Sequence, residues 1–97
     1  MDREQVPDFL SENAIETVIC AGTDPTGVVR GKRLTIPYFL EIMDKGISFS
    51  SFLMTTTTMD EVLPGIFDTG VPDVRGLPDL DSLRIAEWDP DTAVVLM

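Results

Sequence analysis

The sequence predicts an α+β fold for residues 1–97, as a single domain in which one sheet packs on one main helix with a short helix before it. Two strand-like runs, residues 15–21 and 28–36, flank the turn signal Asp24-Pro-Thr-Gly27. Residues 38–45 carry apolar side chains at helical spacing. The 97 residues can bury one small core. A sheet of about four to five strands fits that size.

A short helix and a hairpin are expected first. Residues 3–12 place their apolar side chains on one helical stripe, and Pro7 fits the first turn, where its missing N–H costs little. Threonine and β-branched residues favour a strand over residues 15–21. In the turn that follows, Asp24 offers a side-chain acceptor and Gly27 can adopt a positive φ. The hairpin is therefore predicted from local turn chemistry.

The main helix should follow Pro37, which suits a first helical position, and should span residues 38–45 with a cap at Gly46. Residues 54–76 show no sustained period and predict a long loop. Three further strands are expected at residues 47–53, 82–85 and 92–97. Because a domain seldom ends on exposed apolar residues, we expect residues 1–97 to be a fragment of a longer protein.

The chain is acidic, with 17 Asp and Glu against 7 Lys and Arg and a formal net charge of −10. Such a surface repels phosphate, which excludes nucleic acid and anionic membranes as partners. The sequence has no histidine, so the usual general base and the commonest zinc ligand are missing, and we expect no metal site within it. The lone Cys20 lies in an alternating apolar run, which predicts a buried thiol. No run has the length of a membrane span and no signal peptide is evident, which predicts a cytoplasmic location.

Three of the four residues from Arg30 to Arg33 are basic. A phosphate loop needs four residues between its glycines and a Ser or Thr after its lysine. Here Gly27 and Gly31 enclose three residues, and an arginine follows Lys32. The spacing therefore argues against ATP binding by this segment. We expect these cations to serve packing or a contact with a partner outside the chain.

Two other features invite functional interpretations. The stretch from Asp79 to Leu83 begins like a calcium loop, but a leucine occupies the third ligand position and the turn glycine is missing. Solvation or capping explains these carboxylates better. Trp88, in a turn predicted at residues 88–91, is expected to be a core or interface anchor, because an amphipathic side chain suits partly wet packing.

Five landmarks follow one another along residues 15–97. They are Asp24-x-x-Gly27-x-x-Arg30-Gly31-Lys32-Arg33, an amphipathic helix between Pro37 and Gly46 followed by Phe49, Pro72-Asp73-Val74, Pro78-Asp79-Leu80, and Trp88-x-Pro-x-Thr92-Ala93. In this order they resemble the N-terminal domain of the glutamine synthetase family, and they are closest to its γ-glutamylpolyamine synthetase-like branch. The resemblance implies a β-grasp domain, in which a twisted mixed sheet curls around the helix near residues 38–45.

The resemblance also implies a C-terminal catalytic domain beyond this chain, so the 97 residues alone are not expected to be catalytic or to bind a cofactor. The whole enzyme would ligate the γ-carboxylate of glutamate to ammonia or an amine through a γ-glutamyl phosphate, in nitrogen metabolism. It would use ATP and Mg²⁺ or Mn²⁺. The small domain would complete the active site of a neighbouring subunit in a homo-oligomeric ring.

Site residues follow from the same resemblance. Typical members carry an Asp-Gly-Ser-Ser stretch after a Phe, whereas here Phe49 is followed by Ser50 and Ser51. Ser50 stands where the family has the aspartate that helps to bind ammonium, which would suit a bulkier amine better than free ammonia. We expect Ser50 and Ser51 at the amine side of a neighbour's site. The residues expected at interfaces are Arg30, Lys32, Arg33 and Trp88.

A second class of function stays open at this point. The chain could be a free-standing, acidic, ubiquitin-like domain that binds other proteins. The coding sequence after Met97 separates the two hypotheses, because a stop codon there would favour the interaction domain.

Overall fold

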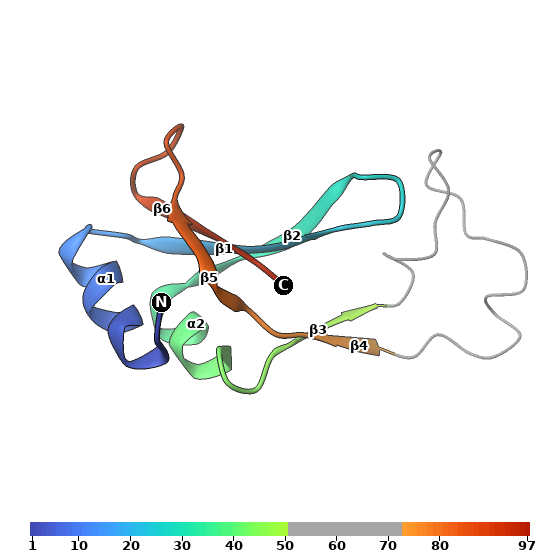
Figure 1. The fold of residues 1–97 in the computed structure, drawn as a ribbon, viewed down its shortest axis with the longest axis horizontal. Coiled ribbons are helices and arrows are strands. Elements are labelled where there is room, and N and C mark those ends of the chain that lie inside the picture. Colours follow the sequence, from blue (N-terminus) through green and yellow to red (C-terminus); the bar gives the residue numbers. More distant parts are fainter. Residues whose placement is uncertain (51–72) are drawn as a thin grey trace, which may run out of the picture.

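Residues 1–50 and 73–97 are described by a computed structural model, in which helices cover one face of a sheet and a small ribbon lies beside it (Figure 1). The helical elements are η1 (Arg3–Gln5), α1 (Val6–Glu12) and α2 (Ile36–Ile42). The strands are β1 (Thr17–Thr23), β2 (Val29–Thr35), β3 (Ile47–Ser50), β4 (Asp73–Gly76), β5 (Asp79–Ile85) and β6 (Thr92–Leu96).

The main sheet is mixed and has the strand order β2-β1-β6-β5. Its two central strands, β1 and β6, are parallel, with Thr17 opposite Thr92 and Ala21 opposite Leu96. The edge strands β2 and β5 are antiparallel to their neighbours. A mixed sheet with its first and last strands side by side at the centre and helices on one face confirms the predicted α+β class.

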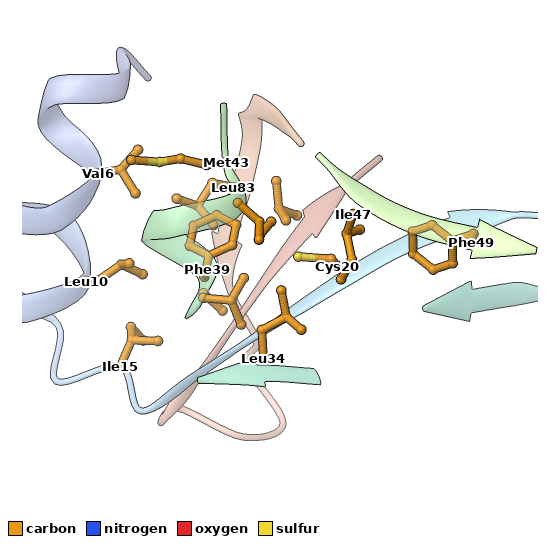
Figure 2. Packing of buried hydrophobic residues seen from close by; sticks show 14 residues of the cluster. Val6, Leu10, Ile15, Cys20, Leu34, Phe39, Met43, Ile47, Phe49 and Leu83 are labelled. Carbon is orange, nitrogen blue, oxygen red and sulfur yellow. The ribbon is translucent and has the colours of Figure 1, made fainter. Parts of the chain in front are cut away.

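The core lies between the two α-helices and the main sheet. Phe39 of α2 is fully buried, and Figure 2 shows its ring in the middle of the cluster, between side chains of α1 and those of the strands. The buried cluster comprises Val6, Leu10, Ile15, Val18, Cys20, Leu34, Phe39, Ile42, Met43, Ile47, Phe49, Leu83, Ala93 and Val95. The predicted burial of Cys20 is confirmed, and this burial raises the pKa of its thiol to about 11.

The ribbon formed by β3 and β4 corrects part of the sequence prediction. Residues 73–76 were expected in a loop, but they pair with β3 in an antiparallel ladder that sets Ile47 opposite Gly76 and Ser50 opposite Asp73. The rest of that predicted loop, residues 54–72, lies outside the described residues. β4 is largely exposed and only four residues long, so its side chains carry no pattern that indicates a strand.

Other boundaries shift by a few residues. The main helix begins at Ile36 and ends at Ile42, earlier at both ends than predicted, with Pro37 in its first turn. β5 begins at Asp79 rather than Ser82. In β2, Gly31 faces β1 so closely that a Cβ would lie 2.2 Å from the carbonyl oxygen of Cys20. This close approach explains why a glycine interrupts the basic run.

Candidate functional site

Asp24 anchors the turn between β1 and β2. Its side chain is fully buried, and Oδ1 accepts the backbone N–H groups of Thr26 and Val28 at 2.9 and 3.0 Å and the Thr26 hydroxyl at 2.6 Å. Gly27 has a φ of +85° and donates its N–H to the Asp24 carbonyl, as the turn signal predicted. The Asp-Pro-Thr-Gly stretch therefore folds as a closed turn around a buried carboxylate.

Arg30 completes this arrangement. Its Nε donates to Asp24 Oδ2 at 3.0 Å, which places a positive charge beside the buried carboxylate. The Thr26 hydroxyl, supported by Arg30 and by backbone N–H groups, holds the pKa of Asp24 well below its usual range, although burial opposes this shift. Asp24 thus stays ionised at neutral pH and acts as a structural anchor for Arg30. Sequence reasoning assigned Asp24 to the turn but missed this ion pair.

Lys32 extends from β2 to the ribbon. Its Nζ donates to the Ser48 carbonyl oxygen at 2.9 Å and lies 5.2 Å from the centre of the Phe49 ring. Both partners belong to β3, so an edge residue of the main sheet holds the ribbon.

Arg33 points to the opposite side of β2. Its Nη1 donates to the hydroxyls of Thr17 and Thr92 at 2.8 and 2.9 Å and lies 3.9 Å from Asp89 Oδ2. Thr92 is almost fully buried and donates its own hydroxyl to Asp89 at 2.9 Å. All three cations of the basic arm therefore have partners within the chain, which fits the packing alternative. Their role at an interface remains a prediction.

A groove of about 300 Å³ opens between the ribbon and the ends of β1 and β6. Its charged lining residues are Arg30 and Arg75, and Arg75 also donates to the Lys45 carbonyl at 2.6 Å. The lining residues are Gly22, Thr23, Arg30, Phe49, Val74, Arg75, Gly76, Leu77 and Met97. Arg75 and Gly76 were missed from the sequence because their segment was assigned to a loop.

Of the two predicted amine-side residues, the structure describes Ser50. Ser50 is the last residue of β3, directly after Phe49, and it pairs with Asp73. Ser51 lies outside the described residues. Ser50 therefore stands at the tip of a strand that Lys32 holds against the main sheet.

Trp88 lies in the turn between β5 and β6, as predicted, and is 77% exposed. This exposure rules out the core alternative. Its role as an interface anchor remains a prediction. Two hydrogen bonds hold this turn. The main-chain carbonyl of Asp89 accepts the N–H of Thr92, and the Asp89 carboxylate accepts the Thr92 hydroxyl.

The described residues offer no metal centre of their own. Within residues 1–50 and 73–97, no three Asp, Glu or Cys side chains gather closely enough to hold an ion. We assign none of these residues to a metal or nucleotide. The helices in the same ranges are too short and too polar to cross a bilayer.

Comparisons with known proteins relate the chain to two ligases. The chain is 34% identical over 98 residues to a glutamate–isopropylamine ligase from a Pseudomonas species, an alignment that covers 95% of this chain and 21% of that protein. It is 32% identical over 81 residues to type-1 glutamine synthetase 2 of Dictyostelium discoideum, covering 79% of this chain and 16% of the relative. No family model matches the chain.

Solved structures show the same fold. The chain superposes on GmaS in its ADP complex with a TM-score of 0.72 and on GmaS without ligand with 0.71, at 22% and 23% identity. These alignments cover 92% and 91% of this chain, and 19% of each GmaS chain.

The fold and the site thus define a small α+β domain whose ribbon projects a strand end, Ser50, beside the main sheet. The chain matches the N-terminal domain of the glutamine synthetase family, which confirms the resemblance seen in the sequence. It spans about a fifth and about a sixth of the length of the two curated relatives.

Proposed function

We propose that this chain is the N-terminal domain of an ATP-dependent ligase that joins the γ-carboxylate of glutamate to an amine. The observation that carries this proposal is the 34% identity, over 95% of the chain, to a glutamate–isopropylamine ligase. The same alignment favours a ligase domain over a free-standing interaction domain, because the matched protein is several times longer than this chain. The particular γ-glutamylpolyamine branch stays a prediction.

The proposed chemistry has two steps at the glutamate side chain. Transfer of the ATP γ-phosphoryl group to a carboxylate oxygen gives an acyl phosphate and ADP. The lone pair of the amine nitrogen then attacks the acyl carbon, the bond from that carbon to the phosphate oxygen breaks, and the nitrogen loses a proton. We assign both steps, with ATP and Mg²⁺ or Mn²⁺, to a catalytic domain outside this chain, because the alignment with the glutamate–isopropylamine ligase covers only 21% of that protein.

The role proposed for this domain is to shape the amine side of the active site in a neighbouring subunit of a homo-oligomeric ring. Ser50 ends β3, where the family resemblance places an aspartate. A carboxylate attracts a small cation such as ammonium. A serine hydroxyl is neutral and smaller, so it neither selects for ammonium nor excludes an amine that carries an alkyl group. We therefore propose an organic amine as substrate, in a cytoplasmic enzyme.

The test is ADP release by the full-length protein with glutamate and a panel of amines: ammonium, methylamine, isopropylamine and a polyamine. We expect release to require both glutamate and an amine, with kcat/KM higher for an organic amine than for ammonium. Ser50→Asp should move this preference toward ammonium. Ser48→Asp, which adds the same charge two residues earlier at an exposed position of β3, is the matched control. Failure of every amine to stimulate ADP release would rule out the ligase function.

A further inference from the structure

Lys32 lies on the side of β2 that faces the core. It is opposite Cys20 in the register with β1, and it shares its face with Leu34 by strand alternation. Cys20 and Leu34 are both buried. Lys32 itself is exposed, and its ammonium lies against β3.

The Lys32 ammonium makes two different contacts with consecutive residues of β3. It donates a hydrogen bond to the main-chain carbonyl of Ser48 at 2.9 Å. It also lies 5.2 Å from the centre of the Phe49 ring, within the range of a cation–π interaction. One side chain thereby fixes both the main chain and an 8% exposed aromatic of the ribbon.

Such an attachment matters because, among residues 1–50 and 73–97, β3 and β4 form a sheet of their own with no ladder to the main sheet. A second polar contact of the ribbon, from Arg75 to the Lys45 carbonyl, reaches the turn after α2 rather than the main sheet. Gly76 lets Phe49 and Met97 close over β4, since a Cβ there would lie 3.0 Å and 2.8 Å from their side chains. The Phe49 ring thus packs close to Gly76 of β4 and also contacts the Lys32 ammonium of β2.

We propose that Lys32 is a positioning residue that sets the place of Ser50, the next residue of β3 after Phe49, relative to the main sheet. The catalytic consequence rests on the proposed function, in which Ser50 meets the amine. Loss of the ammonium should then raise the KM for the amine. The KM values for ATP and glutamate and the kcat should stay unchanged, because those steps are assigned to another domain.

The experiment compares three variants of the full-length protein. Lys32→Met keeps the aliphatic stem and removes the charge, and Lys32→Arg keeps a cation that can donate to Ser48 and stack on Phe49. Lys45→Met removes a lysine whose side chain makes no hydrogen bond or ion pair with the described part of the chain. Amide hydrogen exchange across β3 and β4 reports the attachment directly, and amine-dependent ADP release reports its effect on KM.

In Lys32→Met we expect exchange in β3 and β4 to accelerate by about fivefold or more, the smallest factor that one hydrogen bond and one exposed cation–π contact together correspond to. Exchange in β1 and β6 should not change. The amine KM should rise by about the same factor. Lys32→Arg should restore both values, and Lys45→Met should resemble the unmodified protein.

Unchanged ribbon exchange in Lys32→Met would overturn the proposal. Faster exchange with an unchanged amine KM would overturn the link between Lys32 and the amine site. If the unmodified protein releases no ADP with any amine, the proposed function fails, and the exchange result alone then decides whether Lys32 positions β3.

Discussion

Replacing Phe39 with alanine should destabilise the domain by about 3–5 kcal/mol, the usual cost of truncating a buried phenylalanine. Phe39 is 0% exposed and lies where α1, α2 and the main sheet meet. At about 25 cal/mol per Å², burial of about 150–250 Å² corresponds to about 4–6 kcal/mol. That figure is an upper bound, because the alanine Cβ stays buried. A loss of this size is a large share of the about 5–15 kcal/mol that a typical domain has.

Urea unfolding of residues 1–97, followed by far-ultraviolet circular dichroism, measures this loss as a change in the free energy of unfolding. Tyr38→Ala is the matched control, because Tyr38 is the preceding residue of α2 and is 44% exposed. It should cost less than about 1 kcal/mol. Phe39→Leu keeps most of the side-chain volume and should fall between the two. Equal costs for Phe39→Ala and Tyr38→Ala would mean that α2 does not turn this face to the core.

Three further predictions concern the hairpin. Gly31→Ala should lower the free energy of unfolding in urea by about 1–3 kcal/mol, because its Cβ would lie 2.2 Å from a backbone oxygen. Gly22→Ala, whose nearest atom is 3.9 Å away, should cost less. The reverse order would refute the close approach of the strands. Because the folded pKa of Asp24 is lowered, its contribution is fully present above its unfolded pKa of about 3.9 and is lost as pH falls toward the folded value. The stability difference between the unmodified chain and Asp24→Asn should therefore be constant from about pH 7 to 5 and shrink below about pH 4; a change between pH 5 and 7 would point to another group. Burial raises the pKa of the Cys20 thiol to about 11, so the native thiol should resist iodoacetamide at about pH 8 and react once urea unfolds the chain; equal labelling rates in the two states would show that Cys20 is accessible.

Elements with local causes could be predicted from the sequence. The β1–β2 turn follows from Asp24, Pro25 and Gly27, whose side chains and backbone preferences act within four residues. Strand alternation also puts consecutive residues such as Lys32 and Arg33 on opposite faces of β2. The structure confirms this, since Lys32 contacts β3 whereas Arg33 contacts threonines of β1 and β6.

Features with distant causes could not be predicted in the same way. β4 is a strand because its backbone pairs with β3, whereas its own mostly exposed side chains carry no pattern that indicates a strand. The partners of Lys32 and Arg33 lie 16 or more residues away in the sequence. A run of basic residues therefore indicates positive charge but not the groups that these residues contact. The role of Ser50 depends on a partner subunit, so it stays a proposal.

The most direct test of the account is whether the full-length protein releases ADP when both glutamate and an amine are present. We predict release that depends on both, with an organic amine preferred over ammonium. ADP release that no amine stimulates in the presence of glutamate would contradict the account.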